Sequence, residues 1–211
     1  MELERGTVPF RPGEDGTTDD AESDRSLPRL VAAARAGGVL FLPTDTIYGL
    51  SCRFGDLPAR ERIRQAKGPD RPATFVSLVA DRAMAYRYAE PPDGEAAAYL
   101  EAHWPGPVTL ILRAHPDCDP ELLGPNGTLA FRWPARRRLC ALIGAVGEPL
   151  ISTSANRHGE APCASVEEAV ALFGAEIDLY ADAGPLPGAA STLVDLSAGG
   201  IRVLRGPGGR G

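Results

Sequence analysis

The sequence predicts a single α/β domain whose twisted sheet mixes parallel and antiparallel strands and is flanked by helices. Three observations support this fold class. A chain of 211 residues is long enough for one sizeable core. Short apolar runs that fit buried strands alternate with helix-like segments through most of the chain. The last 35 residues instead contain strand-like runs with no helix between them, which favours a mixed sheet over a purely parallel one.

Six helices are expected from capping residues and from helical spacing of apolar residues. Ser26, Asp56, Asp81, Asp93 and Ser165 each stand where a side chain can cap a first turn, and Ser165 opens a capping-box sequence. The remaining helix follows a proline and begins with three arginines. In order, the expected helices span residues 27–35, 59–66, 82–88, 94–104, 135–146 and 165–174.

Eight strands are expected from short apolar runs bounded by glycine, proline or polar residues. The first should end at Pro43, because proline cannot donate to a central ladder. The loop over residues 115–126 is the longest irregular piece. In order, the expected strands span residues 38–42, 74–79, 108–112, 128–133, 150–153, 177–180, 192–196 and 201–204.

The net charge of −6 is concentrated at the N-terminus. Residues 1–25 hold eight acids and three bases, whereas the remainder holds 20 acids and 19 bases. We expect residues 1–25 to form an acidic disordered arm and residues 26–207 to form the domain. The nearly neutral domain does not have the basic balance of a typical nucleic-acid-binding module, although a local arginine patch would be compatible with it.

The chain shows no export signal and no apolar run of about 20 residues, so we expect a cytoplasmic protein without a membrane span. Its four cysteines are scattered without a CxxC pair, which disfavours a zinc site and favours free thiols. Neither common glycine fingerprint for nucleotide binding is present.

The segment 42–50, which reads LPTDTIYGL, is the centre of the predicted site. It places two threonines and an aspartate at the C-terminal end of a buried strand, where ligands of α/β sheets usually bind. Their hydroxyl and carboxylate groups can hold an amino group or a hydroxyl of a small ligand. On composition alone, an ordinary Thr/Asp turn is an equally good interpretation.

Lys67 is the only lysine, whereas the other 21 bases are arginines. A position that keeps lysine fits a need for a compact ammonium group. With Arg71, four residues later on a Gly/Pro loop, it can clamp a polyphosphate. A cation that merely interacts with the end of a helix is the alternative.

Two further segments carry candidate binding residues. Ser152, Ser154 and Asn156 follow an apolar strand and could bind phosphate, ribose or an adenine edge, or simply form a turn and a helix cap. Thr128 and Arg132 are four apart on a strand and so share a face. A half-buried Arg132 needs an anionic partner, either a ligand carboxylate or a structural aspartate.

Ser191 and Arg205 stand at the ends of the last two strands. By themselves they are ordinary strand-end residues.

Five segments, taken in order, resemble signatures of the YrdC family of threonylcarbamoyl-AMP synthases. They read PTDTIYGL, QAKGPDRP, WPGPVTLIL, TLAFRWP with STSAN, and ASTLVD followed by LRGPG. The resemblance runs from about Leu30 to Pro207 and implies the YrdC-like α/β fold. It further implies ATP-dependent condensation of L-threonine and bicarbonate into threonylcarbamoyl-AMP, with release of pyrophosphate, for the threonylcarbamoyladenosine modification of tRNA.

The resemblance also implies roles for individual residues. Threonine would be bound by Thr44, Arg132, Ser152 and Ser191. ATP would be bound by Lys67, Thr128, Ser154, Asn156 and Arg205. Lys67 and Arg71 would neutralise charge during the reaction, with Mg²⁺ bridging the phosphates.

The partners implied are proteins that transfer the threonylcarbamoyl group to tRNA. Two alternatives remain open: a diverged relative that binds double-stranded RNA or nucleotide without catalysis, and a related carbamoyl transfer that uses carbamoyl phosphate.

Overall fold

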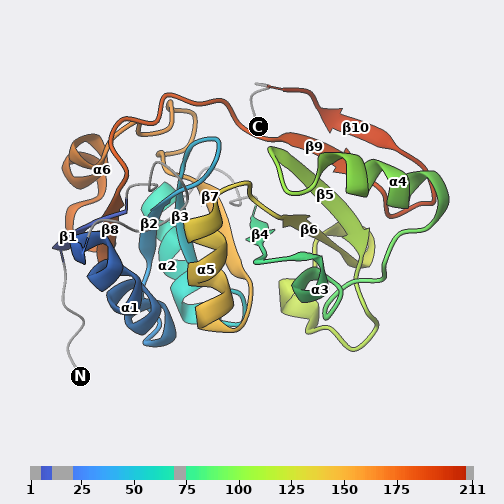
Figure 1. The fold of residues 1–211 in the computed structure, drawn as a ribbon, viewed down its shortest axis with the longest axis horizontal. Helices are drawn as coiled ribbons and strands as arrows, with labels where there is room; N and C mark the ends of the chain where they lie inside the picture. Colours follow the sequence, from blue (N-terminus) through green and yellow to red (C-terminus); the bar gives the residue numbers. More distant parts are fainter. Residues whose placement is uncertain (1–5, 11–20, 69–74, 208–211) are drawn as a thin grey trace.

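The computed structural model describes residues 6–10, 21–68 and 75–207, without the side chains of residues 21–24. Within these ranges, ten strands form one mixed sheet in the order β1-β8-β2-β3-β7-β4-β6-β5-β9-β10, which confirms the predicted fold class. Figure 1 shows two groups of strands along this sheet. The left group joins β1, β8, β2, β3 and β7 to helices α1, α2, α5 and α6, and the right group includes β5, β6, β9 and β10 with α3 and α4.

Most expected elements are present with shifted ends. The helices are α1 (Ala21–Arg35), α2 (Leu57–Lys67), α3 (Arg82–Ala85), α4 (Gly94–His103), α5 (Arg137–Val146) and α6 (Val166–Phe173), with short 3-10 turns at Pro120–Leu122, Pro125–Gly127 and Gly174–Glu176. The strands are β1 (Gly6–Pro9), β2 (Leu40–Pro43), β3 (Tyr48–Arg53), β4 (Val76–Leu78), β5 (Val108–Arg113), β6 (Thr128–Arg132), β7 (Leu150–Ser154), β8 (Leu179–Asp182), β9 (Thr192–Asp195) and β10 (Arg202–Arg205).

The prediction of a disordered arm over residues 1–25 is wrong at two places. Residues Gly6–Pro9 form β1, which pairs in parallel with β8 through Gly6↔Leu179 and Val8↔Ala181. The strand was not predicted because its few apolar residues stand between acidic segments. Val8 is nevertheless only 1% exposed and packs in the core. Its stability therefore comes from β8, a strand more than 170 residues away in sequence.

The second error concerns the start of α1. Ser26 does not cap this helix, which already begins at Ala21. Ser26 is instead buried inside it and accepts a hydrogen bond from Arg138 Nη2 at 2.8 Å. Pro28 consequently lies within the helix, while Leu30 and Ala34 point into the core as the apolar stripe predicts. Contact with α5, rather than an N-cap, thus fixes this turn of the helix.

Strand β3 was not predicted, because the segment after Pro43 was interpreted as a loop. It forms an antiparallel hairpin with β2, in which Pro43 pairs with Tyr48 and Leu42 with Gly49. Pro43 is tolerated because β8 pairs with β2 only at Leu40 and Phe41, so proline has a neighbouring strand on one side alone. The hairpin is closed by a four-residue turn at residues 44–47, which becomes the centre of the candidate site.

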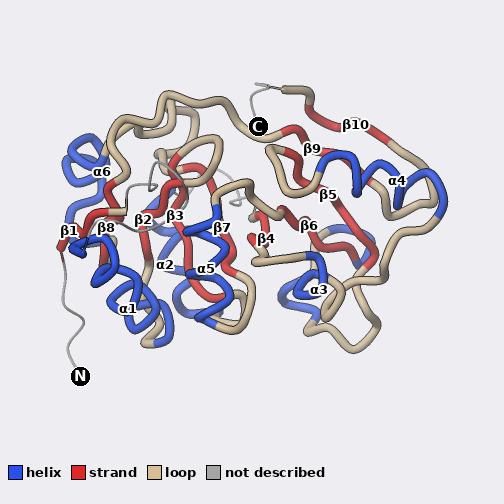
Figure 2. The backbone as a smooth tube through the Cα atoms, viewed as in Figure 1, coloured by secondary structure: helices blue, strands red, loops and turns tan. Residues whose placement is uncertain are grey.

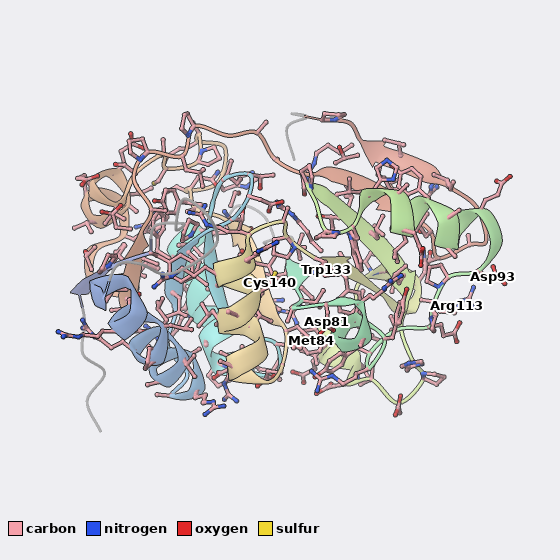
Figure 3. The ribbon with its side chains drawn as sticks, viewed as in Figure 1. Asp81, Met84, Asp93, Arg113, Trp133 and Cys140 are labelled. Atoms are coloured by element: carbon pink, nitrogen blue, oxygen red, sulfur yellow. The ribbon has the colours of Figure 1, made fainter. Side chains whose placement is uncertain are left out.

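The other caps follow expectation more closely. Asp56 accepts from Ala59 N at 3.0 Å, and Ser165 accepts from Glu168 N at 3.3 Å. Asp81 accepts from Met84 N at 2.7 Å, and Figure 3 shows these two residues together at the start of α3. Asp93 precedes α4 without a side-chain cap.

The strand groups are also connected by a long segment over residues 183–191, which runs from β8 to β9 (Figure 2). It passes directly over the turn of the β2–β3 hairpin, because a Cβ atom at Gly188 would lie 1.6 Å from the carbonyl oxygen of Thr46. Only glycine fits at this crossing. None of the described helices is long and apolar enough to cross a membrane.

Candidate active site

Lys67 is the last residue of α2, and its ammonium group is directed at the end of β7. Its Nζ donates to Ser154 O at 2.7 Å, to Asn156 O at 3.1 Å and to Asn156 Oδ1 at 2.9 Å. Three residues that the family resemblance implies for ATP binding are therefore in mutual contact. We call Lys67, Ser154 and Asn156 the lysine cluster.

The lysine is buried, which the sequence did not indicate. Lys67 is 7% exposed, and burial lowers its pKa from the ordinary value of 10.5 to about 8. The group therefore stays mostly charged at neutral pH but close to its titration range. An ammonium held by neutral oxygens in a partly desolvated place attracts anions more strongly than one in bulk water.

The loop after β7 is fixed so that its polar groups face Lys67. Ser154 Oγ donates to Asn156 Oδ1 at 2.6 Å, while Asn156 Nδ2 donates to Glu160 O at 2.8 Å. Arg157 holds the same loop to the end of α2 through Ala66 O and forms a bidentate pair with Glu176 at 2.9 and 3.1 Å. The lysine cluster is therefore supported from α2 and from the 3-10 turn that follows α6.

A second cluster forms around Arg132, the last residue of β6. Arg132 is 5% exposed; its Nη2 forms an ion pair with Asp45, and its Nη1 donates to Thr46 Oγ1 at 2.8 Å. Asp45 also accepts from Ala135 N at 3.1 Å. A structural aspartate is thus the anionic partner in this structure. We call Arg132, Asp45 and Thr46 the arginine cluster.

Thr44 forms the framework of the hairpin turn. Its hydroxyl donates to Ile47 O at 2.7 Å and accepts from Thr46 N at 3.1 Å and Ile47 N at 3.2 Å. Thr46 Oγ1 lies 2.9 Å from Thr44 Oγ1. These contacts engage the hydroxyl that was predicted to bind threonine, so Thr44 holds Asp45 and Thr46 in place.

The pairing of β3 with β7 brings the two clusters to the same end of the sheet. Gly49 on β3 pairs with Ser154 on β7. Two residues before Gly49, the carbonyl of Ile47 accepts the hydrogen bond from the Thr44 hydroxyl, so the hairpin turn lies next to the lysine cluster. Ser152 is buried beside Gly49, where an added Cβ would lie 2.4 Å from Ser152 Oγ. Ser51 Oγ donates to Ser152 Oγ at 3.0 Å and fixes its rotamer.

The segment that carries Arg132 continues into α5 and is held there. Cys140 Sγ donates to Pro134 O at 3.2 Å, and Figure 3 shows Cys140 close to Trp133 between the two groups of strands. Burial raises the pKa of the Cys140 thiol to about 11, so it is a neutral packing group. Arg136 Nη1 donates to Thr44 O at 3.1 Å and ties α5 to the hairpin turn.

Ser191, which immediately precedes β9, contacts Arg205, the last residue of β10. Arg205 donates to Ser191 O from Nε at 3.2 Å and from Nη2 at 3.0 Å. Ser191 Oγ lies 2.8 Å from Thr109 Oγ1, and Thr109 is fully buried on β5. Ser191 is thereby positioned from both neighbouring strands.

Three of the described site residues, Thr128, Ser191 and Arg205, make no described hydrogen bond or ion pair with the lysine cluster or the arginine cluster. Thr128 is at the opposite end of β6 from Arg132, about 13 Å along the strand, and its hydroxyl donates to Pro125 O at 2.8 Å. Arg71 lies outside the described residues. The binding roles of all the predicted site residues remain predictions.

Three residues of the site received no individual role from the sequence: Asp45, Thr46 and Thr109. Asp45 and Thr46 belong to the segment that was singled out, but their pairing with Arg132 spans 87 and 86 residues. The signal for Asp45 was the need of a buried arginine for an anion. Thr109 gave no signal, because one hydroxyl within an apolar strand is unremarkable.

The chain is similar to known proteins over most of its length. The Sua5/YciO/YrdC family model, described as "Telomere recombination", matches residues 32–206. A protein of Thiobacillus denitrificans named threonylcarbamoyl-AMP synthase is 37% identical over 188 residues, covering 86% of this chain and 97% of that protein. A putative threonylcarbamoyl-AMP synthase of Mycobacterium tuberculosis is 33% identical over 89% of this chain and 86% of its own length.

Solved structures show the same fold. Escherichia coli YciO matches with a TM-score of 0.84 and 27% identity, over 98% of this chain and 97% of that one. P. abyssi Sua5 complexed with L-threonine matches with a TM-score of 0.82 and 27% identity, over 96% of this chain and 57% of Sua5. From the matched family model and these relatives, the chain belongs to the Sua5/YciO/YrdC family.

Proposed function

We propose that this chain is a threonylcarbamoyl-AMP synthase, which makes L-threonylcarbamoyl-AMP and pyrophosphate from L-threonine, bicarbonate and ATP. One observation carries the proposal: a buried ammonium and a buried guanidinium flank the same end of the β3–β7 pair. Two separate cations suit two anionic substrates that must react with each other. Relatives named for this activity support the proposal, since one of them is matched over 97% of its length.

We assign threonine to the arginine cluster. Arg132 has the planar fork that binds a carboxylate, and it is held rigidly by Thr46 and by Gly106 O. Ser152 and Ser191 would complete the pocket for threonine, with Thr44 holding the turn. The structure of a relative, Sua5, bound to L-threonine supports this choice of substrate.

We assign the triphosphate of ATP to Lys67 and the nucleoside to the groups around it. Ser154 and Asn156 already lie in contact with the ammonium, and Thr128, Arg205 and Arg71 are the further candidates for nucleotide contacts. Lys67 and Arg71 would neutralise charge on the phosphates as the reaction proceeds.

Mg²⁺ would enter with the nucleotide. Among the residues that the structure describes, no group of three or more His, Cys, Asp or Glu side chains could hold a metal ion. A magnesium ion bound mainly by phosphate oxygens and water fits that residue set. When bound, it would neutralise phosphate charge.

The proposed reaction needs positioning more than covalent help from the protein. The amine of threonine attacks the carbon of bicarbonate, water leaves, and a carbamate forms. A carbamate oxygen then attacks the α-phosphorus of ATP, and the bond to pyrophosphate breaks. Arg132 would orient threonine while Lys67 draws charge from the phosphates, so holding both substrates supplies most of the acceleration.

The product would serve proteins that transfer the threonylcarbamoyl group to adenosine in tRNA. An unstable mixed anhydride needs a nearby acceptor, so such transfer proteins are the expected partners. The activity would place the chain in the cytoplasm, with tRNA itself or double-stranded RNA as a further binding partner.

The test is pyrophosphate release from ATP, with threonine and bicarbonate omitted in turn. We expect release only when both are present, and loss of release in Arg132→Ala. Release that does not depend on threonine would refute the proposal. Binding of double-stranded RNA with a steep salt dependence and no release would favour the non-catalytic alternative.

A further inference from the structure

Asp45 pairs with Arg132 at the proposed carboxylate site. The sequence indicated only that a carboxylate in this segment can hold an amino group, and the assignment of threonine above gives Asp45 no role. We propose that Asp45 is a specificity-determining residue: its carboxylate binds the α-ammonium group of the amino-acid substrate, while Arg132 binds the α-carboxylate. This inference rests on the proposed function of Arg132 and adds a second contact that selects amino acids over other small carboxylic acids.

The first argument is the number of unused hydrogen-bonding positions on this ion pair. Arg132 has five N–H donors, and the described contacts use three: to Gly106 O, Thr46 Oγ1 and Asp45 Oδ1. The carboxylate of Asp45 has about four acceptor positions, and two are used, by Arg132 and by Ala135 N. The pair therefore keeps donors and acceptors next to each other.

The second argument is the match with an amino acid. In a zwitterion, the carboxylate and the ammonium are attached to the same carbon, so a binding site needs a cation and an anion in contact with each other. Arg132 and Asp45 are such a contact pair. The unused donors of Arg132 fit the carboxylate, and the unused acceptors of Asp45 fit the ammonium.

The third argument is burial, which strengthens the electrostatic interactions of these charged groups. The side chains of Arg132 and Asp45 are 6% and 13% exposed, so Asp45 is the more accessible member. Arg136 lies close enough to Asp45 for an attractive interaction, and together these three side chains carry a net positive charge. This net positive charge favours binding of a ligand carboxylate. A ligand ammonium would be repelled by the two arginines unless Asp45 offsets their charge.

The fourth argument is rigidity. Ala135 N fixes one carboxylate oxygen of Asp45, and Thr44 fixes the turn on which Asp45 lies through Thr46 N and Ile47 N. Gly188 packs against the carbonyl of Thr46 from the opposite side. Such a carboxylate is pre-positioned, so little ordering is required when a ligand binds.

Calorimetric titration of the full chain with two ligands tests the inference. The ligands are L-threonine and the matching 2,3-dihydroxybutanoate, which has a hydroxyl in place of the amine. The variant is Asp45→Asn, whose amide oxygen can still accept from Ala135 N. We expect threonine to bind at least about tenfold more weakly to Asp45→Asn, because a charge-assisted contact is lost. Binding of dihydroxybutanoate should be unchanged or tighter.

A matched control removes another buried aspartate that also pairs with an arginine. Asp178 accepts from Val39 N at 2.8 Å and pairs with Arg62 at 2.8 Å, away from the arginine cluster. Asp178→Asn should leave the ratio of the two affinities as in the unmodified chain. Asp45→Glu, which restores the charge, should recover part of the preference for threonine.

The outcomes separate the two levels of the proposal. If the unmodified chain binds threonine but Asp45→Asn weakens both ligands equally, Asp45 only supports Arg132 and the inference is overturned. If the unmodified chain binds no threonine, the proposed function itself fails. If Asp45→Asn is unfolded by circular dichroism, Asp45→Glu and Asp45→Ser are compared by the same affinity ratio, and an unchanged ratio overturns the inference.

Discussion

Replacing Lys67 by methionine separates a catalytic role from a structural one. Methionine has similar length and keeps the apolar stem, so it removes the ammonium with little change in packing. The expected result is loss of pyrophosphate release by a factor of about 100 or more, the usual effect of removing a group that stabilises developing charge. The free energy of unfolding should change little, although Lys67 is buried and makes several hydrogen bonds.

The structure supplies the magnitude. Methionine leaves Asn156 O without its described donor, which costs about 1–3 kcal/mol. Ser154 O keeps Asn156 N at 3.0 Å, and Asn156 Oδ1 keeps the hydroxyl of Ser154. In the opposite direction, the pKa of Lys67 falls from 10.5 to about 8, which corresponds to about 3 kcal/mol of unfavourable burial of its charge. The two effects nearly cancel.

Thermal unfolding and pyrophosphate release, measured on the same preparations, test this balance. We expect the free energy of unfolding to change by less than about 2 kcal/mol, a Tm shift below about 8 °C for a domain of this size. Arg64→Met, one turn earlier on α2 with a partly exposed side chain, is the matched control and should keep its activity. Destabilisation well above that limit, or release within tenfold of the original, would refute the reasoning.

The remaining predictions concern packing and pH. Gly49→Ala should destabilise the chain by about 1–3 kcal/mol and raise the KM for threonine, because the added methyl group displaces the Ser152 side chain. An unchanged free energy of unfolding in denaturant would contradict this prediction. Thr109→Val should raise the KM for threonine through Ser191, and Thr109→Ser should restore it. Since the pKa of Lys67 is lowered to about 8, ATP binding should weaken above that pH, while threonine binding alone should not follow this titration. Between about pH 8 and 10.5, Lys67 is deprotonated in the folded chain but still protonated in the unfolded chain. Over this range the contribution of Lys67 to the free energy of unfolding should therefore rise with pH, which urea unfolding can measure.

The elements that could be predicted are those with a local signal. Asp56, Asp81 and Ser165 cap helices as expected, because capping depends on residues three positions apart. Buried runs such as β5 and β6 were recognised from their apolar residues alone. Here sequence and structure agree because the stabilising contacts are close in the chain.

The elements that could not be predicted depend on distant partners. β1 exists through its pairing with β8, and β3 is enclosed between β2 and β7. β3 contains Gly49, a residue type that is depleted in strands, and its conformation is set by the neighbouring strands. The local sequence pattern does not specify which distant strand a segment pairs with, so these two strands could not be predicted from it.

The candidate site shows the same division. Lys67 and Ser154 were singled out as candidates from residue chemistry, and the structure places Lys67 Nζ 2.7 Å from the carbonyl oxygen of Ser154. The pairing of Arg132 with Asp45 required the fold, because a buried arginine specifies the charge of its partner but not its position. Burial of Lys67 likewise follows from the packing of α2 against the loop after β7.

The central claim is that a single site joins threonine, bicarbonate and the adenylate of ATP. The most direct measurement is mass spectrometry of the adenylate formed from ATP, threonine and isotope-labelled bicarbonate. The account predicts an adenylate that contains threonine and the labelled carbon, formed together with pyrophosphate and absent in Lys67→Met and Arg132→Ala. An adenylate without the label, or the labelled product undiminished in both variants, would contradict it.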